Sequence, residues 1–208
     1  MNKILLNIKA QSFNLDYFQD LLGVKNNEVF TDVIRFLDNN KIGILSLKNK
    51  MISFSESDKI QMILIAIRSG CDIQTCSQLL TWKDFEAFTS EVLIKSDYDT
   101  KVNIHLTKPR CQLDVVAVKN NFLLCIDCKH WRNYSRSGII PYIEKQIVRT
   151  RIFLANNKKI KKALPMLVTL YDSNFKLICG VPIVPIKSLQ SFLLEFETLE
   201  EQLLFIYN

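Results

Sequence analysis

The chain has 208 residues, of which 48% are hydrophobic and 23% charged, enough for one domain or a core domain with a small appendage. No apolar run approaches the roughly 20 residues that a bilayer-spanning helix requires. The N-terminus also lacks a long apolar stretch followed by a small-residue cleavage site, so we expect no signal peptide. We therefore expect a cytoplasmic protein without a membrane partner.

The positive charge is concentrated in one segment. The net charge is +6, and residues 129–162 alone carry ten lysines and arginines against one acid, Glu144. The rest of the chain is therefore slightly acidic. A basic block of this kind favours a polyanion such as nucleic acid as partner, and a solvated charged face is the alternative.

The six cysteines suit a reducing compartment and mostly lie within apolar runs, where cysteine acts as a small hydrophobic residue. Cys125 and Cys128 form a CxxC pattern inside the apolar run FLLCIDCK. Because residues three apart on a strand face opposite ways, we interpret this pair as structural. The alternative is a zinc site shared with Cys71 and Cys76.

Residues 1–80 are predicted to form a mainly helical N-terminal module. Apolar residues recur at helical spacing near Phe30 and again near Ile60, and the stretch 42–54 between them is short and β-prone. Helices with a small hairpin are compatible with a winged-helix-like module. Its net charge is only +1, so packing or dimerisation is supported at least as well as DNA binding.

Residues 81–208 predict an α/β domain with a mixed central sheet flanked by helices. Thr81 and Asp84 form a capping-box-like helix start, and Tyr98–Leu106 alternates strictly as a half-buried strand does. The further expected elements are strands at 111–118 and 122–129, a helix opened by Pro141, strands at 165–170 and 177–183, and a closing helix near 189–196. The expected order is α-β-β-β-α-β-β-α.

Charged residues stand at the end of the most apolar of these strands. Asp127 and Lys129 directly follow FLLCI, and two residues apart on a strand share a face. The short turn at residues 119–121 makes the two preceding strands an antiparallel hairpin. Pairing outward from that turn sets Asp114 across from Asp127 or close to it.

Two carboxylates this close repel each other and are costly to bury, which a divalent cation between them would explain. An all-oxygen site suits Mg²⁺ or Mn²⁺. On the helix before, Glu86 borders an interior-facing stripe, so a third carboxylate points the same way. The alternative interpretation is a strand-end ion pair beside a surface acid.

The stretch from Trp82 to about Leu154 resembles the core of the PD-(D/E)XK nuclease superfamily, particularly Mrr-type restriction endonucleases and archaeal Holliday-junction resolvases. The resemblance rests on Glu86 in DFEAF, Asp114 in QLDVVAV, and Asp127 and Lys129 in CIDCKHW. Two departures are Leu113 in place of the motif proline and an aspartate where glutamate is commoner. The family implies a restriction-endonuclease-like αβββαβ core.

The resemblance also implies a function and a set of roles. The expected activity is Mg²⁺- or Mn²⁺-dependent endonucleolytic hydrolysis of DNA, linear or branched. Asp114, Asp127 and the Cys128 carbonyl would hold the metal, Lys129 would orient the attacking water, and Glu86 would bind a metal-bound water or a second metal.

The helix after the motif is predicted to contact nucleic acid. Lys145 and Arg149 are four residues apart and share a face with Gln146 beside them. Lys158 and Lys159 are expected to extend the same positive surface. Directly after the motif, we interpret His130 as a polar loop residue and Trp131 as packing.

Two other functions are compatible with the same residues. One is a non-catalytic nucleic-acid-binding relative of the nuclease fold, and the other is a basic scaffold that docks an acidic partner. The sequence also leaves open DNA against RNA, any recognition sequence, and the oligomeric state, although a homodimer would let two sites cut two strands.

Overall fold

The computed structural model describes residues 11–131 and 134–208, which form two compact units divided between Leu79 and Leu80. The sequence-predicted boundary lies one residue later. The N-terminal stretch in which no signal peptide is expected begins outside the described residues, and Arg132 of the basic block also lies outside them. Each unit is described by itself.

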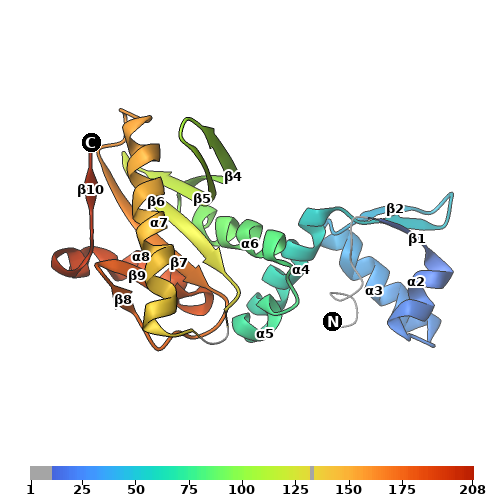
Figure 1. Cartoon of the computed structure of the whole chain (residues 1–208). Coiled ribbons are helices and arrows are strands. Elements are labelled where there is room, and N and C mark those ends of the chain that lie inside the picture. The colour runs from blue at the N-terminus through green and yellow to red at the C-terminus, as the bar shows by residue number, and fades with distance from the viewer. Residues whose placement is uncertain (1–10, 132–133) are drawn as a thin grey trace. The chain divides into compact units, whose positions relative to one another are not determined.

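The first unit combines helices with a small antiparallel sheet (Figure 1). The sheet has the strand order β1-β3-β2. Asn14, Asn26 and Ser55 precede three of the helices as N-caps. The elements are β1 (Ser12–Asn14), α2 (Leu15–Leu22), α3 (Asn27–Asn39), β2 (Ile44–Ser46), β3 (Met51–Ser53), α4 (Glu56–Arg68) and α5 (Ile73–Ser77).

The second unit confirms the predicted α/β class with a mixed central sheet. Its elements begin with α6 (Trp82–Ile94), β4 (Asp99–Thr107), β5 (Arg110–Lys119), β6 (Phe122–Lys129) and α7 (Arg136–Ala155). They continue with β7 (Lys162–Thr169), β8 (Leu177–Ile178), β9 (Val181–Pro185), η1 (Ile186–Ser188), α8 (Leu189–Glu195), η2 (Phe196–Gln202) and β10 (Ile206–Tyr207). None of the helices described in either unit is both long and apolar enough to cross a membrane.

The sheet runs in the order β4-β5-β6-β7-β9-β8, with β10 added against β7. The strands β4, β5 and β6 are antiparallel neighbours, whereas β6 and β7 are parallel and are joined through α7. Helix α7 packs on one face of the sheet, and α6 and α8 pack on the other (Figure 1). This arrangement buries β6 on both faces, as its nearly continuous apolar sequence predicts.

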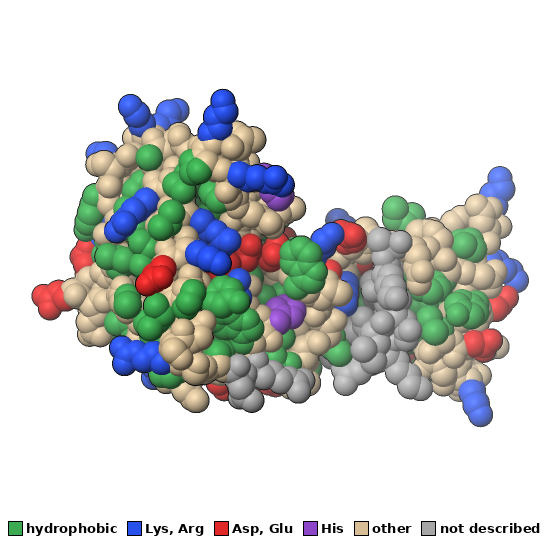
Figure 2. All heavy atoms as spheres, viewed as in Figure 1, with side chains coloured by type: hydrophobic (Ala, Val, Ile, Leu, Met, Phe, Trp, Pro, Cys, Tyr) green, Lys and Arg blue, Asp and Glu red, His purple; other side chains and the backbone are tan. Residues whose placement is uncertain are grey.

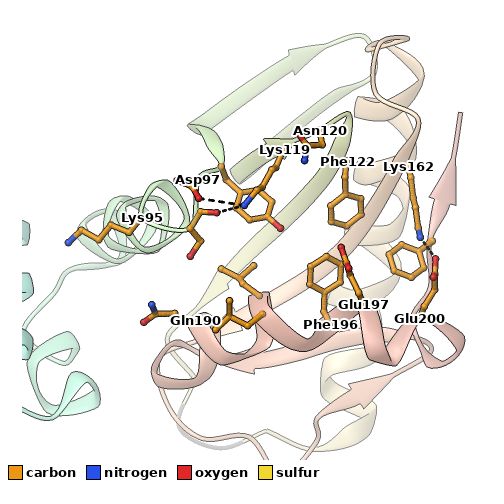
Figure 3. Close-up of a pocket in the computed structure, with 15 residues that line it drawn as sticks. Lys95, Asp97, Lys119, Asn120, Phe122, Lys162, Gln190, Phe196, Glu197 and Glu200 are labelled. Atoms are coloured by element: carbon orange, nitrogen blue, oxygen red, sulfur yellow. Dashed lines mark hydrogen bonds and ion pairs between the residues drawn. The ribbon is translucent and has the colours of Figure 1, made fainter.

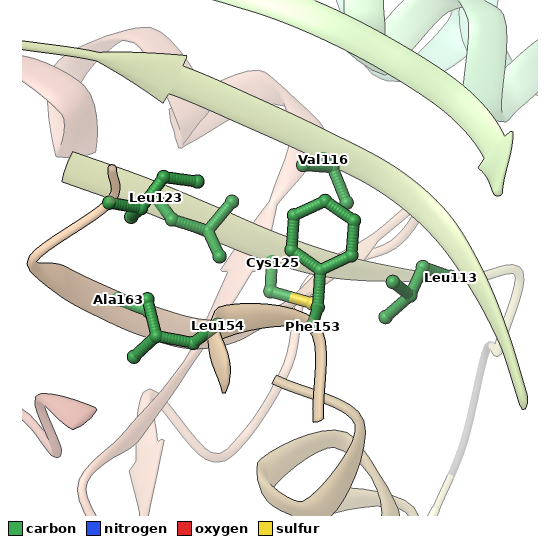
Figure 4. Packing of buried hydrophobic residues seen from close by; sticks show 8 residues of the cluster. Leu113, Val116, Leu123, Cys125, Phe153, Leu154 and Ala163 are labelled. Carbon is green, nitrogen blue, oxygen red and sulfur yellow. The ribbon is translucent and has the colours of Figure 1, made fainter. Parts of the chain in front are cut away.

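A hydrophobic cluster lies between α7 and the sheet (Figure 4). Phe153 and Leu154 of α7 pack there against Leu123 and Cys125 of β6, and the last three are almost completely buried. The cluster fixes the helix over the centre of the sheet. Residues that follow β6 and residues on α7 are thereby held close to each other.

The β5–β6 hairpin sets the alignment of the two strands that carry the predicted acids. Asn120 and Asn121 both adopt positive φ, 50° and 63°, in the tight turn between the strands. Asparagine tolerates this left-handed conformation better than most residues, and two such residues match the twist of a hairpin. Pairing outward from the turn reaches Val115 opposite Ile126, so Asp114 and Asp127 are the next residues on their strands.

Two sequence-predicted elements differ from the structure. Helix α7 begins at Arg136, with Ser135 as N-cap, so Pro141 lies inside the helix instead of opening it. Proline has no N–H, so the carbonyl of Ser137, four residues earlier, lacks its helical hydrogen bond. Ser137 is exposed, and water can bind this carbonyl instead. The strand expected at 177–183 is two short strands, because Cys179 and Gly180 turn the chain at positive φ.

Truncation of the central cluster should destabilise the second unit. We expect Leu123→Ala to lower its free energy of unfolding by about 2–5 kcal/mol, because the side chain is fully buried. Both tryptophans of the chain lie in this unit, so the unfolding transition is measured by tryptophan fluorescence in urea. The control is Val148→Ala at an exposed position of α7, and an equal loss of stability in both variants would contradict the packing described here.

Candidate active site

A cavity of about 330 Å³ opens where β6 ends, between α6 and α7. All four residues predicted to be catalytic line it. Figure 2 shows basic, acidic and hydrophobic side chains close together on one face of this unit. The lining residues are Trp82, Glu86, Gln112, Asp114, Asp127, Cys128, Lys129, Tyr142, Lys145 and Arg149.

Asp127 is a buried carboxylate with two cationic partners. Its side chain is only 3% exposed, and one oxygen, Oδ2, lies 2.6 Å from Lys129 Nζ. The other oxygen accepts a hydrogen bond of 3.4 Å from Arg149 Nη1 of α7. Lys129 shares a strand face with Asp127, as predicted, whereas the contact with Arg149 depends on the packing of α7 against the sheet.

Asp114 lies at a break in the regular pairing of β4 and β5. The ladder pairs Val102 with Val115 and Ile104 with Leu113 but omits Asn103 and Asp114. Asn103 adopts φ 53°, which is unusual within a strand. The carboxylate of Asp114 instead accepts the backbone N–H of Cys128 at 2.9 Å. This bond ties Asp114 to the strand that carries Asp127.

Glu86 reaches the cavity from α6. That helix begins at a capping box in which Thr81 and Asp84 bind each other's backbone N–H groups, as predicted from the sequence. Phe85 is buried in the core, and Glu86, the next residue of the helix and 7% exposed, lines the cavity. The structure thus brings three carboxylates from a helix and two strands to one place.

The electrostatics of the cavity disfavour full ionisation of these acids. Burial, followed by repulsion from Asp114, raises the pKa of Glu86 from 4.5 to about 7, although Lys129 opposes the shift. Burial, followed by repulsion from Asp127, raises the pKa of Asp114 from 3.8 to about 6, although the Cys128 N–H opposes it. Burial is thus the main reason why Glu86 and Asp114 resist ionisation, and the neighbouring carboxylates add to it.

The donor atoms fit a hard divalent cation. Among the described residues, no group of three or more histidine, cysteine, aspartate and glutamate side chains is arranged to hold a metal ion. Mg²⁺ does not require one, since it commonly uses one or two carboxylates together with water and substrate phosphate. Asp114 and Asp127 supply such a pair, and the raised pKa of Asp114 indicates that added positive charge is favourable there.

The predicted nucleic-acid-binding residues separate into three groups. Lys145 and Arg149 line the cavity, whereas Gln146 is 1% exposed and donates to the Cys125 carbonyl at 2.8 Å. The prediction for Gln146 is wrong: Gln146 is one position further along α7 than Lys145, and its side chain points onto the sheet. Lys158 and Lys159 are exposed but precede β7, at the opposite end of the sheet from the cavity (Figure 1), so they do not extend the surface formed by Lys145.

The residues around the acid–lysine motif have structural partners. Cys128 Sγ lies 3.7 Å from Thr89 Oγ1 of α6, whereas Cys125 is buried beside Gln146 of α7. The two cysteines thus face opposite sides of the sheet. His130 packs edge-on against Phe85, with 4.8 Å between ring centroids, and burial lowers the pKa of its imidazole.

Sequence reasoning did not assign Trp82, Gln112 and Tyr142 to the cavity. For Tyr142 a signal was present, because positions 142, 145 and 149 share one face of a helix. Gln112 donates to Asn103 at 3.0 Å, a contact made across the break in the β4–β5 ladder and not visible in either strand alone.

A larger cavity, about 590 Å³, lies at the other end of β6 (Figure 3). Its floor includes the rings of Phe122 and Phe196, which stack with centroids 5.4 Å apart. Lys119 faces Asp97 at 3.8 Å, and Lys162 pairs with Glu200. In each of these two pairs the opposite charges offset each other. None of the predicted catalytic residues lines this cavity.

The chain is similar in sequence to a curated archaeal protein. It is 30% identical over 118 residues to a protein of Archaeoglobus fulgidus named only as uncharacterized, and the match covers 55% of this chain and 90% of that protein. No protein-family model matches the chain.

Three solved structures are similar over much of the chain. Protein VC1899 from Vibrio cholerae matches 93% of it at 18% identity with a TM-score of 0.41, and AF1548, a protein of unknown function, matches 56% at 16% with 0.39. Can2 from Sulfobacillus thermosulfidooxidans, solved with cyclic tetra-adenylate, matches 97% at 19% with 0.34. The chain spans 47%, 66% and 50% of these three chains, respectively.

The raised pKa of Glu86 predicts a pH-dependent stability. A carboxyl whose pKa is higher in the folded state binds more protons when folded, so its contribution falls as pH rises from about 4.5 to about 7. Without divalent cations, Glu86→Gln should therefore gain stability relative to the wild type across this window. The measurement is urea unfolding by tryptophan fluorescence at several pH values. A difference between the two proteins that does not change with pH would show that Glu86 titrates normally.

Proposed function

We propose that this chain, which belongs to the same family as the uncharacterized Archaeoglobus fulgidus protein, is a metal-dependent nuclease that hydrolyses phosphodiester bonds of DNA. The observation that carries the proposal is the convergence of Glu86, Asp114, Asp127 and Lys129 in one cavity. They come from a helix and two strands in the order that the PD-(D/E)XK resemblance implies. A surface ion pair would account for Asp127 and Lys129 but not for buried Glu86 and half-buried Asp114 beside them.

The proposed reaction joins a water oxygen to phosphorus and breaks the phosphorus–oxygen bond to the leaving sugar. Asp114 and Asp127 would hold a divalent cation, which would supply Lewis-acid chemistry toward the water and the phosphate. Lys129 Nζ lies 2.6 Å from Asp127 and would orient the attacking water and donate to the phosphate. Glu86, with a pKa of about 7, can accept a proton near neutral pH.

Lys145 and Arg149 serve as the phosphate-binding residues in this proposal. Both line the cavity from α7, and the helix itself is fixed by the hydrophobic cluster on its other side. Arg149 also contacts Asp127, so it links the binding surface to the reacting groups. The non-catalytic alternative would need the same basic residues but gives no reason for three carboxylates in one cavity.

Loss of either aspartate should abolish cleavage. We expect Asp114→Asn and Asp127→Asn to remove Mg²⁺- or Mn²⁺-dependent cleavage of DNA while leaving fold and DNA binding largely intact, because each removes one anionic donor. Cleavage is measured on single-stranded, duplex and branched DNA, and EDTA should stop it. The matched control is Asp99→Asn on the exposed part of β4, which should cleave normally. Full activity in either site variant would refute the assignment.

The salt dependence of DNA binding tests the basic residues. Replacing Lys145 and Arg149 together with alanine should weaken binding similarly for all sequences. It should also flatten the slope of log affinity against log salt by roughly 1 to 2 units, since each neutralised phosphate contributes about −0.9. The control is the double replacement of Lys101 and Lys176, which are exposed outside the cavity. An unchanged slope in the site variant would place the DNA on another surface.

A further inference from the structure

Two aromatic side chains stand exposed at the mouth of the candidate site. Trp82, the first residue of α6, is 54% exposed, and Tyr142 of α7 is 42% exposed. Both line the same cavity as the acids. They lie on the two helices that flank the ends of β5 and β6, so the carboxylates are placed between them.

The exposure of these rings is not explained by packing of the fold. Neighbouring Trp131 and Tyr134 pack against the hydrophobic cluster beneath the N-terminal part of α7. Tyr142 makes an edge contact with Trp131, at 4.7 Å between centroids and 70° between planes. That contact holds the orientation of Tyr142 and leaves part of the ring in solvent.

Positive charges accompany both rings. Lys83 Nζ lies 5.6 Å from the centroid of the Trp82 ring, and Lys129 and Lys145 lie 5.4 and 6.0 Å from that of Tyr142. Aromatic rings beside cations are what proteins use to bind unpaired nucleotides, because bases stack on the rings while phosphates meet the cations.

We propose that Trp82 and Tyr142 are specificity-determining residues that stack on unpaired bases next to the scissile phosphate. The bases of a regular duplex are stacked and paired inside it, so they reach such rings only after unpairing. The site would therefore favour a single strand, or a strand opened at the cut, over an intact duplex. The inference rests on the proposed function, because it assumes that the cavity binds nucleic acid.

Fluorescence provides a direct test. The chain has two tryptophans, so Trp131→Phe leaves Trp82 as the only one. In EDTA, an oligothymidylate of about a dozen nucleotides, or the matching oligouridylate, should quench the emission of Trp82, whereas a blunt duplex of the same length should not. The unmodified chain and its Trp82→Phe variant are compared in parallel, so that any disturbance by the Trp131 change is recognised.

Affinity measurements separate stacking from general binding. Trp82→Ala and Tyr142→Ala should each weaken single-strand binding roughly 10- to 100-fold and change duplex binding little, while Trp82→Phe and Tyr142→Phe should retain most of the affinity. The matched control is Tyr207→Ala, which removes a ring that is 66% exposed on β10, away from the cavity.

The outcomes distinguish this inference from the nuclease proposal. Absence of quenching, or equal losses on single strand and duplex, would overturn the role of the two rings, even if cleavage depends on Asp114 and Asp127. Conversely, selective loss of single-strand binding supports the rings even if no metal-dependent cleavage is found, because the measurement is made in EDTA and requires no turnover.

Discussion

The arrangement of the candidate site depends on the burial of one carboxylate, that of Asp127, at the end of the central strand. A charge removed from water is costly unless it is paired and hydrogen-bonded. Lys129 on the same strand and Arg149 on α7 both contact it. The second contact requires α7 to lie where the hydrophobic cluster holds it, so the packing of the core and the charge balance of the site constrain each other.

The position of the second acid depends on strand register. The turn at Asn120 and Asn121 aligns β5 with β6, and this alignment sets Asp114 beside Asp127. A shift by one residue would turn every side chain of β5 to the other face of the sheet, since strand side chains alternate. The N–H of Cys128 then fixes the Asp114 carboxylate at the place where pairing with β4 is interrupted.

Sequence patterns predicted the parts of this unit that follow local rules. The capping box at Thr81, strand β6 and the hairpin turn each depend on neighbouring residues, and all three are found as expected. The side chain of Gln146 could not be placed because its direction depends on how α7 rotates against the sheet. Lys145 and Lys158 likewise lie near opposite ends of the sheet. Their separation follows from the parallel pairing of β6 and β7, which cannot be read from the sequence.

The three acids of the candidate site are unevenly compensated by cationic side chains. The two cations of the cavity that contact a carboxylate, among the residues described, both contact Asp127. Burial is the largest cause that raises the pKa of Glu86 to about 7 and that of Asp114 to about 6. Repulsion from Asp114 adds to the first shift, and repulsion from Asp127 adds to the second. A network built only for stability would be expected to pair these acids or to replace them with apolar residues, since unpaired buried charge lowers stability. Strongly shifted carboxyls in an open cavity are instead typical of functional sites, where the cost to folding is offset by what the site binds.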